Sequence, residues 1–532
     1  MKSLDLLLLV PRTMMLKKSV LSIGTLGLAS CLASKGYGVR IVDDNTIYKK
    51  YRDAELLGLI RALDPNVIGI SINVLNAYGC YDLLGKIRDA FPRKIIIAGG
   101  LHTYASADEI MEHDFDVVFR GESEISLSKF MELVTGGGAS VERGFLSSED
   151  TVNGLKKIGG MLFRRGGDVV DTGDSPIVTD LDELPFLDHS LANMEDFVRF
   201  GDDYDAVVNL VNFQRGCPYR CIYCKGAFMS GKIRNNSARH IFGQIKALHE
   251  KYGIDRIDIQ DANFPIDRKR MAEFCDLMIE SGLAKEVKIW CQTSAAISLS
   301  DDELVRLRDA GTIMLCIGVE RFDDDLRQYM KKSGTREDVT SLIKKIHRHG
   351  IGTNMNILLN FPIDNARTLH REAEHLQAML PYVDYFSVIY LVPIPGTEIY
   401  RKENEYHKWY LRPEIYKKIV SFYDMTYDVG TVGLEFNLLN LPEATVRELR
   451  RFKERFYKKN ISSLDQSVLF KTAYHVNMIL ARLSYWVYSI SPRAEAVLFG
   501  LLKKLWAIGF KIFKRKFYYK SPAAIEPAPG TR

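Results

Sequence analysis

The chain has 532 residues, of which 46% are hydrophobic and 26% are charged, and its formal net charge is +5. This composition is typical of soluble globular proteins and excludes a disordered chain or one integral to a membrane. The length exceeds what one hydrophobic core normally organises, so we expect about three domains. Eight cysteines, mostly isolated, do not form a disulfide framework and favour a reducing cytoplasm.

Residues 1–140 alternate apolar runs with amphipathic segments, which predicts a doubly wound, flavodoxin-like α/β domain with a parallel sheet. The pair Gly99-Gly100 ends one run and Gly121-Glu122 ends another. Open parallel sheets bind ligands at the carboxyl ends of their strands, so both pairs are candidate ligand positions. The predicted strands are 4–10, 39–43, 67–72, 94–100 and 116–121.

Residues 141–200 are predicted to contain a β-hairpin, turning at Gly166-Gly167, and a polar connecting arm at 180–190. Residues 201–400 show a second alternating series with six strand candidates, which predicts a partial six-stranded TIM-like barrel. These candidates are 206–213, 255–260, 288–293, 313–320, 352–361 and 385–393.

Three cysteines, Cys217, Cys221 and Cys224, are spaced C-x-x-x-C-x-x-C just after the first predicted barrel strand. A structural zinc site closes with four ligands, and no nearby Cys or His continues such a pattern, although His240 could be recruited. Iron–sulfur clusters usually take four thiolates. Three thiolates on a four-iron cluster would leave one iron open to another ligand. Zinc remains the alternative.

This motif, with Tyr223 before its last cysteine, resembles the radical S-adenosylmethionine (SAM) superfamily. The resemblance implies a [4Fe-4S] cluster held by the three cysteines, with SAM bound to the open iron. It also implies reductive cleavage of SAM to a 5′-deoxyadenosyl radical, and therefore an electron donor such as flavodoxin or ferredoxin. The protein would bind and orient cofactors that carry the difficult chemistry.

Later barrel strands are similar to the superfamily's SAM-binding motifs. DIQDANF makes Asp261 a candidate for SAM's amino group, and GVERF makes Glu320 a candidate for its ribose or methionine end. NILLNFP places Asn360 beside the adenine, at a position where glycine is common in the family. Tyr223 is the fourth candidate contact. Taken alone, either acid could be a surface residue or a helix cap.

The first domain resembles the cobalamin-binding domains of one subgroup of these enzymes. Ser71 and the pair Gly99-Gly100 match the elements that line the slot for the nucleotide tail, where small side chains allow close approach. His102 could contact the corrin or be a solvated loop residue. The histidine of the family's D-x-H-x-x-G motif is absent after the first strand, so cobalt would lack that lower ligand. Ordinary turn chemistry is the alternative for these residues.

Residues 401–532 are predicted to form a helical, basic C-terminal domain with a disordered end, because they contain 24 Lys and Arg against 12 Asp and Glu. Residues 498–515 combine helical apolar spacing with a basic face. Such a helix can lie in a membrane interface or pack on the barrel, and nucleic-acid binding is a weaker alternative. We expect a cytoplasmic protein, with peripheral contact at the inner face of the membrane as one alternative.

Together these patterns predict a cobalamin-dependent radical SAM enzyme. The resemblance favours a C-methyltransferase acting on an unactivated carbon, and the C-terminal helix favours a hydrophobic substrate such as an isoprenoid, lipid or tetrapyrrole. The first alternative is an oxidative, ring-forming cyclase without methyl transfer. A non-catalytic corrin- or metal-binding protein is the alternative from another class. The remaining cysteines are predicted to be core residues: Cys31, Cys80, Cys275, Cys291 and Cys316.

Overall fold

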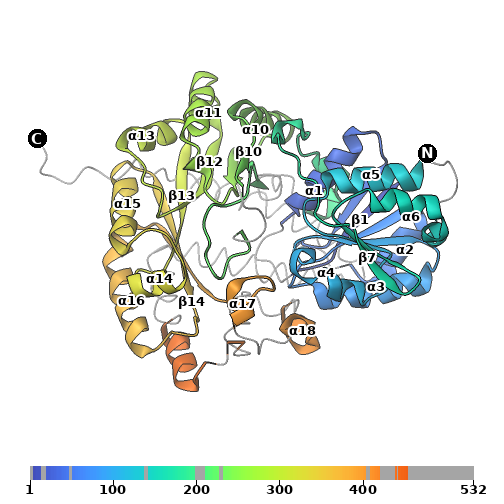
Figure 1. Ribbon diagram of the computed structural model, residues 1–532. Helices are drawn as coiled ribbons and strands as arrows, with labels where there is room; N and C mark the ends of the chain where they lie inside the picture. The colour runs from blue at the N-terminus through green and yellow to red at the C-terminus, as the bar shows by residue number, and fades with distance from the viewer. Residues whose placement is uncertain are drawn as a thin grey trace, which may run out of the picture.

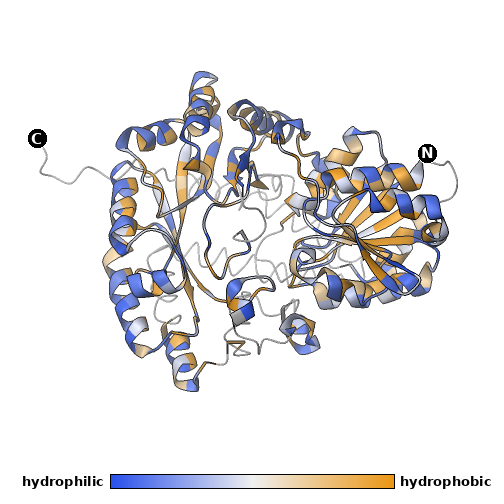
Figure 2. Ribbon diagram, in the orientation of Figure 1, coloured by the Kyte–Doolittle hydropathy of each residue, from blue (hydrophilic) through white to orange (hydrophobic). Residues whose placement is uncertain are grey.

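A computed structural model describes residues 4–13, 20–46, 51–136, 142–197, 210–226, 232–402, 408–419, 438–439 and 441–452. Two sheets organise these residues, one of seven strands and one of six, and each is flanked by helices (Figure 1). Hydrophobic residues concentrate on the strands and on the inner faces of the helices (Figure 2). The α/β fold class that the sequence predicts is confirmed.

The first sheet has the strand order β2-β1-β3-β4-β5-β6-β7. Its first five strands are parallel, in the flavodoxin-like order 2-1-3-4-5. The two strands β6 and β7 extend it as an antiparallel hairpin that turns at Gly166-Gly167, both with positive φ, as predicted. The strands are β1 Leu6–Val10, β2 Val39–Asp43, β3 Val67–Ser71, β4 Ile95–Gly99, β5 Val117–Phe119, β6 Met161–Arg165 and β7 Asp168–Asp171.

Helices cover both faces of this sheet, with α1 and α5 on one side and α3 and α4 on the other (Figure 1). The parallel strands are therefore buried on both faces, which explains their uninterrupted apolar runs. The helices are α1 Ile23–Ser34, α2 Asp53–Leu63, α3 Ala77–Ala90, α4 Thr103–Met111, α5 Glu124–Thr135, α6 Glu149–Lys156 and α7 Met194–Phe197. Three 3₁₀ turns lie among and after them, at Arg143–Ser147, Leu181–Glu183 and His189–Leu191.

The second sheet is entirely parallel and has the order β15-β14-β13-β12-β11-β8, which confirms the predicted partial barrel. Its strands are β8 Leu210–Val211, β11 Arg256–Ile259, β12 Lys288–Ser294, β13 Thr312–Glu320, β14 Gly352–Leu359 and β15 Tyr385–Tyr390. A short antiparallel ladder joins β9 Gln214–Arg215 to β10 Arg234–Asn235.

The connecting helices α11, α13, α15 and α16 cover the outer face of this sheet (Figure 1). The helices of this part are α10 Ala238–Tyr252, α11 Arg268–Glu280, α12 Leu283–Glu286, α13 Asp301–Asp309, α14 Asp324–Tyr329, α15 Arg336–Arg348, α16 Ala366–Met379, α17 Glu398–Lys402 and α18 Pro413–Ile419. Shorter 3₁₀ turns lie at Phe264–Ile266, Leu380–Tyr382 and Trp409–Leu411.

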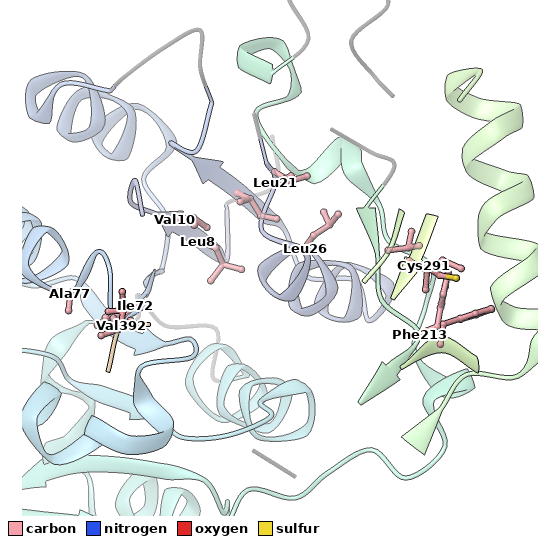
Figure 3. Packing of buried hydrophobic residues seen from close by; sticks show 14 of the residues in the cluster. Leu8, Val10, Leu21, Leu26, Ile72, Ala77, Phe213, Cys291 and Val392 are labelled. Carbon is pink, nitrogen blue, oxygen red and sulfur yellow. The ribbon is translucent and has the colours of Figure 1, made fainter. Parts of the chain in front are cut away.

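The two sheets contact each other through the loop that follows β15. Val392 of this loop is buried beside Ile72, which follows β3, and Ala77, which begins α3, whereas Phe213 and Cys291 belong to the barrel side of the core (Figure 3). Residues 408–419, which the sequence assigns to the C-terminal part, pack on α3 of the first sheet. The predicted domain boundaries at 140, 200 and 400 stay predictions.

The predicted amphipathic helix at 498–515 and the predicted disordered end lie outside the described residues. Within the part of the chain that the structure describes, no helix is long and apolar enough to cross a membrane.

Candidate functional site

The three cysteines lie in a loop that leaves β9 at the carboxyl side of the barrel, and all three are free thiols. Cys221 is buried, Cys217 is half-buried and Cys224 is exposed. The loop closes on itself near Gly226, where a Cβ would make ordinary contacts of 3.5 Å with Cys217 Cβ and 3.6 Å with Cys224 Sγ. The spacing C-x-x-x-C-x-x-C thus places the first and last thiols against one glycine.

Asp261 holds the chain that enters this loop. Its Oδ1 accepts hydrogen bonds from the backbone N–H groups of Phe213 at 2.6 Å and Gln214 at 2.9 Å, and its Oδ2 lies 3.3 Å from Arg270 Nη2. Burial raises the pKa of Asp261, while Arg270 and the two N–H groups act in the opposite sense. The carboxylate is fully buried, so the structure shows a positioning role. Its predicted contact with SAM stays a prediction.

Glu320 and Asn360 end two neighbouring strands, β13 and β14, and both have positive φ, of 64° and 73°. This left-handed conformation explains why glycine suits the position of Asn360, and asparagine is among the residues that tolerate it best. Asn360 is buried, and its Nδ2 donates to the carbonyl of Leu391 at 3.2 Å. Tyr223 packs its ring edge-on against Phe361, the residue after Asn360.

Lys332 brings a positive charge to the cysteine loop. Its Nζ lies 3.4 Å from Glu320 Oε1, and both side chains are largely buried. Burial raises the pKa of the Cys221 thiol, and partial desolvation by neighbouring atoms raises that of Cys224, while the Lys332 ammonium opposes the rise at both. A cation here stabilises thiolates, which are the form that binds iron.

The carboxyl edge of the first sheet holds the second group of predicted residues. Gly100 has φ of 102°, and a Cβ there would lie 2.6 Å from the carbonyl oxygen of Ile72 and 3.2 Å from Ser71 Oγ. Gly99, by contrast, faces open space, since a Cβ there would meet no atom within 4 Å. Only glycine therefore fits at 100, and Gly99 leaves a small-residue opening beside Ser71.

His102 is not a solvated loop residue, because its ring is buried against helix α4. Its Nε2 lies 3.4 Å from Glu109 Oε1, and its ring contacts Tyr410 edge-on. Glu109 also accepts hydrogen bonds from Tyr81 Oη at 2.9 Å and Tyr410 Oη at 2.6 Å. Burial raises the pKa of Glu109, but its hydrogen bonds from His102, Tyr410 and Tyr81 outweigh this and lower it to about 2. The predicted corrin contact of His102 stays a prediction.

A network of four charged residues joins the two candidate sites. Arg215, two residues before Cys217, lies 2.7 Å from Glu122 and 2.6 Å from Glu124. Arg234 on β10 also pairs with Glu122. Glu122 follows β5, so the carboxyl edge of the first sheet is tied directly to the cysteine loop.

The placement of the three thiols bears on the kind of metal group that they could hold. Among the described residues, no three His, Cys, Asp or Glu side chains are placed to hold one metal ion. A four-iron cluster does not require three side chains around one metal ion, because each of its thiolates binds a different iron. The donor set, three free thiols beside a buried lysine, therefore fits a cluster better than zinc.

Two family models match the chain, the radical SAM superfamily over residues 211–376 and the B12 binding domain over residues 16–130. The chain is a radical SAM enzyme with a B12-binding domain. The first match covers the barrel with its cysteine loop, and the second covers the flavodoxin-like sheet with Gly99-Gly100. The enzyme's cofactors are accordingly a [4Fe-4S] cluster, SAM and cobalamin.

The enzyme is 22% identical over 414 residues to an uncharacterised methyltransferase of Pyrococcus horikoshii, covering 75% of this chain and 83% of that one. It is also 22% identical to an anaerobic magnesium-protoporphyrin IX monomethyl ester cyclase of Synechocystis, covering 72% and 73%. Its fold is similar to that of the radical SAM methyltransferase TsrM from Kitasatospora setae, with a TM-score of 0.61 and 14% identity, covering 75% and 78%.

Residues of this chain fit each cofactor. The three thiols would hold three irons, and Glu320, Lys332 and the turn at Asn360 line the neighbouring edge where SAM would bind. Gly99, paired in register with Ser71, leaves open space at the end of β4, which allows the close approach that a nucleotide tail requires. His102, which follows Gly99-Gly100, has its Nε2 3.4 Å from Glu109 Oε1.

Sequence reasoning missed Lys332 and the Arg215–Glu122 pair. Lys332 follows Glu320 by twelve residues, and no periodic pattern marks it as facing the cysteines. Arg215 and Glu122 are separated by 93 residues, so only the docking of the two sheets reveals their contact. The available signal for the pair was its position, because Glu122 follows the predicted strand 116–121 and Arg215 lies two residues after the predicted strand 206–213.

Proposed function

We propose that the enzyme is a cobalamin-dependent methyltransferase that methylates an unactivated carbon of a small molecule. The observation that carries this proposal is the Arg215–Glu122 bridge, which ties the cysteine loop to the carboxyl edge of the B12-binding sheet. Methyl transfer between two cofactors requires both to reach one substrate, and this bridge holds their candidate sites together. The match to the uncharacterised methyltransferase of Pyrococcus horikoshii, which covers 83% of that protein, supports the same activity.

The bound cofactors would supply a carbon radical and a methyl donor. The chain's own residues bind and orient them. Cys217, Cys221 and Cys224 would hold the cluster, and Lys332 would offer its ammonium to the carboxylate of SAM while Glu320 meets the ribose or the amino group. Asp261 positions the loop by holding the backbone of Phe213 and Gln214.

Ring formation without methyl transfer is a second candidate, because the Synechocystis cyclase relative spans 72% of this chain. Both reactions begin with reductive SAM cleavage, and both need an electron donor such as flavodoxin or ferredoxin. The hydrophobic-substrate prediction and the membrane contact depend on residues 498–515, outside the described part of the chain, and they stay predictions.

The experiment is anaerobic reconstitution of the full chain, followed by iron counting, corrin absorbance and detection of 5′-deoxyadenosine from SAM under reduction. We expect about four irons and one corrin per chain. Cys217→Ala should lose both the cluster absorbance and the SAM cleavage. Cys275→Ala is the matched control, because Cys275 lies buried in α11 away from the loop and should leave the iron content unchanged.

Methylated products from isotopically labelled SAM would then separate methyl transfer from ring formation. Iron and SAM cleavage without any affinity for cobalamin would contradict the methyltransferase proposal and favour the cyclase. A chain that binds corrin but never cleaves SAM would contradict both.

A further inference from the structure

The inner face of the barrel sheet carries side chains that the cofactor sites do not use. Along β11 to β15, alternate residues are fully buried beneath the outer helices, as at Ile257, Ile289 and Ile317. The residues between them keep some exposure to the interior. Several residues of this inner face are polar and lie on neighbouring strands. The interior of a barrel that is filled only by its own core is dominated by apolar side chains.

Strand register places these polar residues in two adjacent rows. Gln292 on β12 is paired in register with Cys316 on β13, which is paired with Asn354 on β14. One row nearer the carboxyl edge, Gly318 is paired with Asn356, and Asn356 with Ser387 on β15. The rows therefore lie directly below Glu320, which ends β13.

Some polar side chains of this face are hydrogen-bonded to one another, whereas others have no hydrogen-bond partner among the described residues. Gln292 Nε2 donates to Gln260 Oε1 at 2.9 Å, and Gln260 Nε2 donates to Asp258 Oδ1 at 2.7 Å. This relay has a fixed direction, and among the described residues the carbonyl oxygen of Gln292 accepts no hydrogen bond. Asn356 and Ser387 likewise make no side-chain hydrogen bond within the described part of the chain.

Two atoms near the lower row are also without partners. Trp290 Nε1 and Asn354 Oδ1 are buried and have no hydrogen-bond partner in the described structure. A buried polar atom without a partner costs roughly 1–3 kcal/mol, so such atoms are normally satisfied by a ligand or by water. Together they supply one donor and one acceptor beside the acceptor of Gln292.

The charge on this face restricts the kind of ligand. Its charged residues below Glu320 are Arg256 and Asp258 on β11 and Lys288 at the start of β12, whose ammonium donates to the carbonyls of Ala284 and Lys285. Within the described part of the sheet, neither polar row contains a cation that could bind a phosphate. Apolar residues, Leu358 and Ile389, occupy the β14–β15 side near the carboxyl edge. Amides and a hydroxyl thus dominate the centre.

We infer that the barrel binds an uncharged, polyhydroxylated substrate, a sugar or cyclitol ring, through Gln292, Asn354, Asn356 and Ser387. Each amide offers a donor and an acceptor at once, and a hydroxyl group is the partner that can use both. A ring with several hydroxyls satisfies the two rows together, whereas an isoprenoid would leave them unpaired. This assignment rests on the proposed function, since it names the substrate class of the same site.

The test is saturation-transfer NMR on the full, anaerobically reconstituted chain, with three named probes: N-acetylglucosamine, myo-inositol and farnesol. Ring protons of at least one polyol should receive saturation, and farnesol should receive none. Gln292→Leu removes the acceptor and one donor while keeping a similar volume, and should weaken polyol binding about tenfold, or about 1.4 kcal/mol. Gln328→Leu is the matched control, because Gln328 is an exposed amide on α14 and should change nothing.

Three outcomes would overturn the inference: no polyol binds, farnesol alone binds, or Gln292→Leu binds the polyol as well as the unchanged chain. Reductive SAM cleavage is measured on the same samples. Cleavage without polyol binding would defeat the substrate class and leave the proposed function intact. Polyol binding without cleavage would defeat the proposed function alone.

Discussion

Arg215 Nη1 lies 2.7 Å from Glu122 Oε2, and this contact joins the start of the cysteine loop to the segment that follows β5, the last parallel strand of the B12-binding sheet. Both side chains are mostly buried, and Arg234 donates to the same carboxylate. Burial raises the pKa of Glu122, but Arg234 and Arg215 outweigh this and lower it. The geometry of one cofactor site is thus coupled to that of the other.

Glu122→Gln should destabilise the enzyme by about 2 kcal/mol, because it leaves two buried guanidinium groups facing a neutral amide. In a chain of this size the thermal midpoint should fall by several degrees in calorimetry. Asp171→Asn is the control, since its bridge to Arg120 is partly exposed and should be worth less than about 1 kcal/mol. Equal shifts for the two variants would show that the Arg215–Glu122 bridge does not couple the sites.

The two neighbouring glycines of the B12-binding sheet should respond differently to alanine. Gly99→Ala places a methyl group in open space, so folding should be unchanged and only cobalamin affinity should fall, by about tenfold. Gly100→Ala forces a Cβ against the carbonyl of Ile72 at positive φ and should lower the thermal midpoint itself. Corrin absorbance after gel filtration and calorimetry read the two effects separately. Undiminished cobalamin binding in Gly99→Ala would argue against the slot.

Adjacent lysines offer a test of the SAM site. Lys332→Met removes the ammonium beside Glu320 and the cysteines, and should weaken SAM binding by about tenfold in equilibrium dialysis. Lys331→Met is the control, because Lys331 is half-exposed and pairs with Glu398 instead. Unchanged SAM affinity in Lys332→Met would limit this lysine to supporting the cysteine loop.

Acid should release residues 408–419 from the B12-binding domain. The pKa of Glu109 is about 2 in the fold against an ordinary value of 4.5, so its stabilising contribution is complete above pH 4.5 and is lost as the pH falls toward 2. The full effect is about 3 kcal/mol. Hydrogen exchange of peptides from 408–419 should accelerate across this window.

Glu109→Gln should show that acceleration already at neutral pH, because the amide cannot accept from Tyr81, Tyr410 and His102 as a carboxylate does. Asp108→Asn, at an exposed position of the same helix, should leave the exchange of 408–419 unchanged. Protection of this segment that is independent of both pH and Glu109 would refute the assignment.

The buried carboxyl group of Glu372 should make the stability of the fold depend on pH in the opposite direction to Glu109. Burial raises the pKa of Glu372 to about 7, although Arg321 and the N–H of Phe322 oppose the rise. The folded barrel therefore holds a proton that the unfolded chain has lost, and stability should decrease as the pH rises from 4.5 to 7. Glu372→Gln should flatten this dependence in urea unfolding between pH 5 and 8. Glu374→Gln, exposed on the same helix, should retain it.

Local pattern was sufficient for much of the architecture. Apolar runs bounded by glycine placed the strands of both sheets, and Gly166-Gly167 placed the hairpin, because strand and turn preferences act over a few residues. The cysteine spacing identified the cluster loop for the same reason, since its three ligands lie within eight residues. The reason why asparagine can replace glycine at position 360 became clear only from the positive φ of Asn360, a conformation that tertiary contacts hold.

The sequence by itself determined which segments form strands and which loop carries the thiols, since these depend on neighbours in the chain. Only the tertiary structure decided how Asp261 is used, that His102 is held by Glu109, and that Arg215 meets Glu122 across 93 residues. Those relationships depend on how two sheets dock, and docking is set by burial and charge pairing between residues that no local period connects.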